Sequence, residues 1–199
     1  MGKRYESGDG VEKNPELAFR WYLRSAKNGY FMSYYHVGEM FRDGIGTEQS
    51  SEKAIEWFLM AANKGYRIAW FSIGQMYEGG CPGLDKDLKT AVEYYHEAEN
   101  RGYYVATYHF AQMYEKGIYY DADMDKAIQR YWSASDKGYI PAKIKLYKMY
   151  CKGMDIGNEK AIEELHRGLL NSAWYCRISG DCGSEDKEED ERCGRLGIV

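Results

Sequence analysis

The sequence lacks most of the features that mark a specialised class of protein. No apolar run approaches the roughly 20 residues that a membrane-spanning helix needs, and the N-terminal residues contain no apolar stretch typical of a signal peptide. The formal net charge of −4 is not the basic excess of a nucleic-acid-binding protein. Only three prolines occur, and 16% of the residues are aromatic, which argues against disorder. We expect a folded cytoplasmic protein with no membrane insertion and no nucleic-acid partner.

Cysteine is present but forms no recognisable framework. The five cysteines are an odd number, and no CxxC motif occurs. A secreted, disulfide-stabilised domain more often has an even number at regular spacing. The pattern therefore favours a reducing compartment, in agreement with a cytoplasmic location.

What the sequence does contain is an internal repeat of about 36 residues. A glycine recurs at positions 8, 44, 80, 117 and 153, and an aromatic residue stands three positions before each of them. An alanine recurs at positions 18, 54, 91, 127 and 161, and Gly-Tyr pairs begin at positions 29, 65, 102 and 138. Series that keep one period along the chain are typical of stacked structural repeats.

Each repeat has the pattern of two helices. Apolar residues recur at helical spacing in both halves, and the glycines suit the left-handed position just past a helix end, Gly80 among them. A side chain able to cap a helix precedes each second helix: Asn14, Ser50, Asp87 and Asp123. Small residues at matched positions allow close approach of the two helices. One pair cannot bury its apolar face alone, so stacked pairs share a continuous core, which predicts an α-solenoid.

Residues 33–65 show the spaced pattern most completely. Its members are Ser33, Val37, Gly38, Phe41, Gly44 and Gly46, followed by Lys53-Ala54, Trp57-Phe58, Ala61-Ala62 and Gly65. This pattern resembles the Sel-1-like repeat family, which is related to the tetratricopeptide repeats. Residues 1–30 match from mid-pattern, residues 69–102 and 106–138 match with substitutions, and residues 142–171 match least. The resemblance implies an all-α fold, a right-handed α-solenoid of stacked helix-turn-helix repeats.

The expected organisation has three parts. A solenoid of about five helix pairs covers residues 1–171, divided at 1–30, 31–66, 67–103, 104–139 and 140–171; a C-terminal cap covers 172–180; and an acidic, disordered tail covers 181–199. The first repeat starts inside a helix, so a preceding segment such as a signal is compatible with the pattern. The tail holds seven acidic and three basic residues, so the whole net charge of −4 lies there.

The resemblance implies a non-enzymatic scaffold or adaptor that binds a partner protein or peptide. By similarity to tetratricopeptide repeats, the first helix of each pair lines the concave face. We expect an aromatic stripe flanked by mixed polar groups, formed by Tyr35, Glu39, Arg42, Phe71, Gln75, Glu78, Tyr108, Gln112, Glu115, Ile144 and Lys148. The alternative is that these aromatic side chains only pack between neighbouring first helices. An inhibitor or immunity-type binding protein is a related alternative function.

Candidate chemistry is sparse. Asp121, Asp123 and Asp125 begin like a calcium loop, but Lys126 and Trp132 occupy the sixth and twelfth positions, where glycine and glutamate are needed. The glycine-containing loops follow helices and have no Gly-Lys-Ser/Thr sequence. We predict no catalytic residue, metal or cofactor. A different class of function is a metal- or redox-active protein that uses three C-terminal cysteines with His166: Cys176, Cys182 and Cys193.

Overall fold

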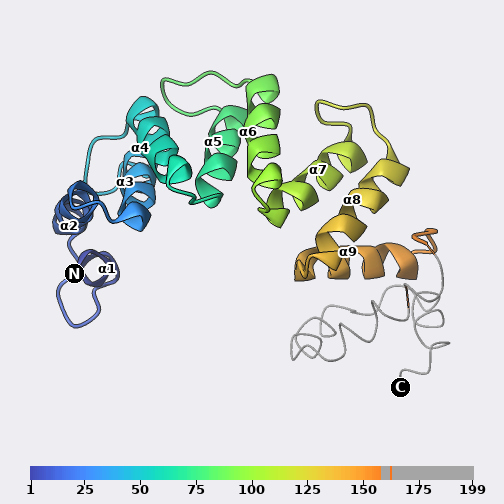
Figure 1. Cartoon of the computed structure of the whole chain (residues 1–199), viewed down its shortest axis with the longest axis horizontal. Helices are drawn as coiled ribbons and strands as arrows, with labels where there is room; N and C mark the ends of the chain where they lie inside the picture. The colour runs from blue at the N-terminus through green and yellow to red at the C-terminus, as the bar shows by residue number, and fades with distance from the viewer. Residues whose placement is uncertain (158–161, 163–199) are drawn as a thin grey trace. The chain divides into compact units, whose positions relative to one another are not determined.

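The computed structural model of the chain describes residues 1–157 and residue 162 (Figure 1). Its helices are α1 (Gly2–Ser7), α2 (Pro15–Lys27), α3 (Phe31–Asp43), α4 (Ser51–Asn63), α5 (Ile68–Gly79), α6 (Leu88–Asn100), α7 (Tyr104–Lys116), α8 (Met124–Asp136) and α9 (Ile140–Cys151). Over these residues no strand forms beyond one isolated bridge between Cys81 and Leu84. The prediction of an all-α solenoid of helical repeats is confirmed. Apart from Ile162, the predicted second helix of the fifth repeat lies outside the described residues, as do the cap and the tail.

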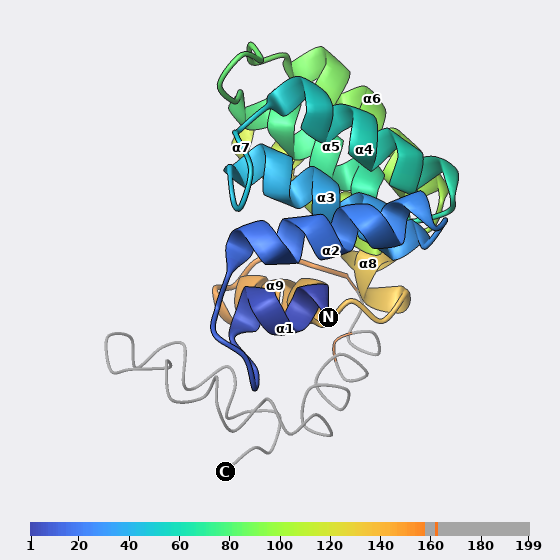
Figure 2. The ribbon, with the colours of Figure 1, turned by 90° about the vertical axis from the view of Figure 1, so that its left-hand side faces the viewer.

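The chain divides into two compact units, and the boundary falls inside α7. Unit 1 is Met1–Ala106, and unit 2 begins at Thr107. In unit 1, α1 packs on α2, α3 on α4 and α5 on α6, while α2 on α3 and α4 on α5 join successive repeats. Figure 2 shows α2, α3 and α4 lying side by side. In unit 2, α8 packs on α9, and residues of α7, α8 and α9 share one core cluster.

The predicted capping residues begin the second helices. The side chain of Asn14 accepts a hydrogen bond from the Leu17 backbone N–H at 2.9 Å, and the other three caps make equivalent bonds at α4, α6 and α8. Each bond satisfies a backbone donor that has no partner inside the helix. Asp123 is therefore a helix cap, as the absence of a complete calcium motif indicated.

One predicted glycine conformation is wrong. Gly8 and Gly44 end α1 and α3 in the left-handed helical conformation. Gly80 also has a positive φ of 71°, but its ψ of 153° places it outside that region. The third loop is one residue longer than its counterparts and closes through hydrogen bonds between Cys81 and Leu84. The longer loop accounts for the different conformation.

The core of each repeat forms where a small residue of the first helix meets an aromatic ring of the second. A Cβ placed on Gly38 would lie 2.7 Å from the Phe58 ring, and one on Gly74 would lie 2.5 Å from the Tyr95 ring. Both rings are 0% exposed. Because real Cβ atoms do not approach that closely, these glycines set the distance between the paired helices. The Ala91 carbonyl oxygen would lie 3.1 Å from the same Cβ on Gly74. The recurring second-helix alanines are also 0% exposed: Ala18, Ala54, Ala91 and Ala127.

A loop glycine makes a comparable contact between repeats. Gly46 has a φ of 69°, and a Cβ on it would overlap the backbone carbonyl of Pro15, at the start of the preceding second helix. Gly10 has the same φ, but a Cβ there would meet only the end of the Arg4 side chain. Tyr119 occupies the equivalent position of the fourth repeat with a φ of 67°, so the conformation alone admits a side chain.

Gly46→Ala is therefore expected to cost about 2–3 kcal/mol of unfolding free energy, because left-handed strain adds to a backbone clash. Gly10→Ala is the matched control, with the same strain against a flexible side chain, and is expected to cost about 1 kcal/mol. Urea denaturation followed by circular dichroism measures both. Equal costs would show that the contact between the loop and Pro15 contributes nothing.

No helix among the described residues combines the length and the apolar character that crossing a membrane requires.

Candidate functional site

The residues predicted to bind a partner lie on the first helices, and we call them the first-helix face. In unit 1 they are Tyr35, Glu39, Arg42, Phe71, Gln75 and Glu78; in unit 2 they are Tyr108, Gln112, Glu115, Ile144 and Lys148. They fall into three sets by position. The aromatic set holds three aromatic residues and Ile144, the middle set holds the polar residues four positions later, and the third set holds the charged residues seven positions later.

The aromatic set serves the packing of the repeats. The Tyr35 ring lies between Phe58 of α4, with centroids 5.2 Å apart, and Tyr66, which follows α4 at the end of the same repeat, at 4.9 Å. Its hydroxyl is 3.1 Å from the Ser72 hydroxyl on α5. Burial raises the pKa of Tyr35 to about 12. Tyr35 is only half-buried, so part of its ring remains accessible.

The same arrangement recurs at Phe71 and Tyr108. Phe71 lies 5.0 Å from Tyr95 and 5.4 Å from Tyr103 between ring centroids, and it is only 7% exposed. The centroid of the Tyr108 ring lies 5.3 Å from that of Tyr131 on α8 and 5.3 Å from that of Tyr139, which follows α8 in the same repeat. These rings therefore pack mainly against second helices and the residues that follow them, and whether they also contact a partner stays a prediction. Ile144, the fourth member, is half-buried.

Two members of the third set, Glu78 and Glu115, accept hydrogen bonds from tyrosine hydroxyls of the second helices, a role that the sequence pattern did not predict. Tyr95 donates a hydrogen bond to Glu78 at 2.6 Å, and Tyr131 donates one to Glu115 at 2.5 Å. In the first repeat, Tyr22 bonds in the same way to a carboxylate of α1. Burial, followed by the hydrogen bond to the carboxylate, raises the pKa of Tyr95 and Tyr131 above the ordinary range. These hydroxyls therefore stay protonated donors at neutral pH.

Glu115 also joins two repeats. The Lys145 ammonium of α9 donates a hydrogen bond to Glu115 at 2.7 Å and lies 5.9 Å from the centroid of the Tyr131 ring. Burial by itself would raise the pKa of Glu115, but the hydrogen bonds from Lys145 and Tyr131 outweigh it and lower the pKa below the ordinary value. This carboxylate is therefore occupied within unit 2.

The second repeat lacks this hydrogen bond between a second-helix tyrosine and a first-helix glutamate, because both residues are replaced. Phe58 has no hydroxyl, and the residue opposite it is Arg42, which makes two hydrogen bonds to Asp43 at 2.7 and 2.8 Å. The glutamate and the tyrosine are therefore replaced together in this repeat, so the pairing is visible in the sequence. Glutamate occurs 16 or 17 residues before a second-helix tyrosine, and arginine occurs 16 residues before phenylalanine.

A double-mutant cycle tests this pairing. Phe58→Tyr alone is expected to be destabilising, because a buried hydroxyl then lacks an acceptor, at a cost of about 1–3 kcal/mol. Adding Arg42→Glu supplies the acceptor, with an expected coupling free energy of about 1–2 kcal/mol. Urea denaturation of the four proteins measures it. Additive effects would mean that the recurring pair is incidental.

The middle set is the accessible part of the face. Gln75 and Lys148 are exposed, and Gln112 is half-buried. The Glu39 carboxylate lies 3.2 Å from Nδ1 of His36, and its side chain is 33% exposed. These positions therefore present two amides, one carboxylate and one ammonium at equivalent places of successive repeats.

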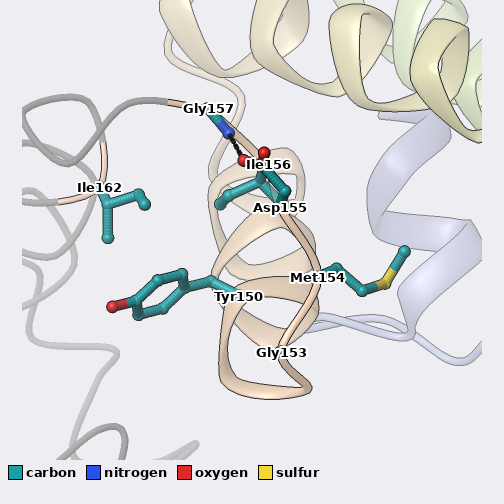
Figure 3. A pocket seen from close by; sticks show the side chains of 7 residues that line it. All are labelled: Tyr150, Gly153, Met154, Asp155, Ile156, Gly157 and Ile162. Atoms are coloured by element: carbon teal, nitrogen blue, oxygen red, sulfur yellow. Dashed lines mark hydrogen bonds between the residues drawn. The ribbon is translucent and has the colours of Figure 1, made fainter.

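A shallow pocket of about 220 Å³ follows α9 (Figure 3). It is lined by Tyr150, Gly153, Met154, Asp155, Ile156, Gly157 and Ile162. Its one carboxylate, Asp155, accepts a hydrogen bond from the Gly157 backbone N–H at 3.1 Å. None of the predicted partner-binding residues lines it.

Among the described residues, no group of three histidine, cysteine or acidic side chains is placed to hold a metal ion. The cysteine cluster that prompted the alternative lies outside the described residues, as does His166.

Comparison with known proteins yields one family and several solved structures. A family model described as the Sel1 repeat matches residues 1–30, 32–66, 69–103 and 105–139, which confirms the predicted resemblance over the first four repeats. No curated protein matches the chain.

The solved structures share the fold. A Sel1 repeat protein from Oxalobacter formigenes is 25% identical, with a TM-score of 0.70 over 98% of this chain and 83% of that one. A protective antigen of uropathogenic Escherichia coli with an SLR fold is 26% identical, with a TM-score of 0.65 over 98% of this chain and 39% of that one. A Pseudomonas aeruginosa protein is 20% identical, with a TM-score of 0.58 over 96% of this chain and 70% of that one.

Proposed function

The chain belongs to the Sel1 repeat family, and from that premise we propose that it is a non-enzymatic scaffold that binds a partner protein or peptide on its first-helix face. Sel1 repeat proteins generally mediate protein–protein interaction, and their fold is typically non-catalytic. The repeat itself supplies a frame, and function comes from the side chains displayed on it.

The observation that carries this proposal is the middle set of the first-helix face. Glu39, Gln75, Gln112 and Lys148 occupy equivalent positions in successive repeats, yet their charge runs from negative through neutral to positive. Packing selects for shape and apolar character, as the neighbouring alanines and rings show. A position that is accessible and varies freely in charge is one that the fold leaves available to a partner. Charges at the edge of an interface set its selectivity more than its affinity.

The test compares two variants of the tagged full chain in partner capture. Glu39→Arg with Gln75→Arg changes the face in unit 1 and adds three positive charges. Glu56→Arg with Gln129→Arg, at exposed second-helix positions, adds the same charge elsewhere. We expect the first variant to lose its partner and the second to keep it, with unchanged helicity in both. Loss of the partner only from the second variant would overturn the proposal.

A truncation separates this proposal from the cysteine-based alternative. If the first-helix face is the binding site, a chain without residues 181–199, which include Cys182 and Cys193, keeps its partner. Loss of the partner on truncation would place the function in the removed segment. The identity of the captured protein then distinguishes a scaffold from an inhibitor or immunity-type protein.

A further inference from the structure

Helix α9 has a charge pattern unlike that of the other first helices. Lys145, Lys148 and Lys152 stand at helical positions i, i+3 and i+7, so they follow one side of α9 and its C-terminal end. No acidic residue occurs between Ile140 and Lys152. We call these three residues the lysine stripe.

The fold does not require lysine at these positions. The equivalent residues are His36, Glu39 and Asp43 in α3, and Ser72, Gln75 and Gly79 in α5. In α7 they are His109, Gln112 and Lys116. The same three places thus hold acidic, neutral or basic side chains on similar helices. Helix packing therefore does not explain why these three positions of α9 are lysines.

Structural roles account for only part of the stripe. Lys145 is bound to Glu115, as described above. Lys152 follows the last turn of α9, where a cation complements the helix dipole, although Asp43 occupies the same place in α3. Lys148 and Lys152 are exposed and form no ion pair with any residue in the described part of the chain. Two ammonium groups therefore remain for a ligand.

We propose that the lysine stripe is the subsite for an acidic segment of the partner protein, which names the partner chemistry of the face in unit 2 and rests on the proposed function. The two exposed ammonium groups pair with carboxylates of that segment, and the half-buried Ile144 beside them contacts its apolar side chains. A protein segment fits better than a nucleic acid. Sel1 repeat proteins generally mediate protein–protein interaction, and the half-buried Ile144 suits an apolar side chain of such a segment better than a phosphate backbone.

The experiment measures binding of a fluorescent alternating Glu-Ala peptide to the full chain by anisotropy, with the matching Gln-Ala peptide as a control. We expect the acidic peptide alone to bind, more weakly as salt rises. Lys148→Glu with Lys152→Glu is expected to weaken binding about tenfold. The matched control is Lys27→Glu with Lys64→Glu, which reverses two exposed lysines at the ends of second helices and is expected to leave binding unchanged.

Several results would overturn this inference. Equal binding by both peptides, or by wild type and the Lys148/Lys152 variant, removes the role of the stripe. Tighter binding of duplex DNA or anionic vesicles through the same lysines assigns it another ligand. If the acidic peptide binds only after the acidic residues of 185–191 are changed to amides, the lysine stripe binds that segment of the chain itself. If partner capture depends on Glu39 and Gln75 but the acidic peptide does not bind, this inference is wrong and the proposed function remains supported.

Discussion

Replacing Gly74 with valine is expected to lower the free energy of unfolding by about 3 kcal/mol or more, because the site is already packed to contact. An added Cβ would lie 2.5 and 2.6 Å from two atoms of the Tyr95 ring and 3.1 Å from the Ala91 carbonyl oxygen. The ring cannot turn aside easily, since it is 0% exposed and its hydroxyl is bound to Glu78. The two helices of the repeat must therefore separate.

Gly79 offers a matched control in the same helix. It has no neighbouring atom within 4 Å of an added Cβ, and its backbone is helical. Gly79→Ala is expected to leave stability unchanged or raise it by up to about 1 kcal/mol through helix propensity. Urea denaturation followed by circular dichroism compares the two variants. If Gly74→Val were as well tolerated as Gly79→Ala, close helix approach would not define the repeat.

Replacing Phe71 with alanine is expected to cost about 3–5 kcal/mol, the usual loss for a large core aromatic side chain. Phe71 is 7% exposed and lies between Tyr95 of α6 and Tyr103, which follows α6 at the end of the same repeat. The substitution therefore removes packing from the core of this repeat. The cost is a large fraction of the 5–15 kcal/mol that stabilises a typical domain.

The control for Phe71 is Gln75, one helical turn further along α5 and exposed. Gln75→Ala is expected to change stability by no more than about 0.5 kcal/mol. Denaturation curves of both variants, measured alongside partner capture, separate packing from binding. If Phe71→Ala kept its stability and lost only its partner, the aromatic stripe would be a contact surface and not part of the stack.

The fold was predictable because its signals are local. The capping side chains bond within their own helix start, as at Asn14 and Asp123, and the spacing of small and aromatic residues repeats along the chain. Gly80 shows the limit of that reasoning, because one inserted loop residue changed its ψ without changing the glycine series. The recurring glycines predict where each first helix ends, but they do not predict the conformation of the loop that follows.

The candidate site was predictable only in part. Counting positions along a first helix predicts that Phe71 and Gln75 both face a partner. In the structure, packing buries Phe71 and leaves Gln75 exposed. The bonds from Tyr95 to Glu78 and from Tyr131 to Glu115 depend on how two helices pack. No spacing within one helix reveals them. The accessible residues that remain are the polar ones, which is why the binding tests change Glu39, Gln75 and Lys148 and leave the rings intact.

Amide hydrogen exchange of the wild-type chain, with and without its captured partner, tests the binding face most directly. Local opening governs exchange, so a bound partner slows it in the helices that the partner contacts. We expect added protection in first helices, among α3, α5, α7 and α9, and none in α4, α6 and α8. Protection confined to α4, α6 and α8 would contradict this expectation.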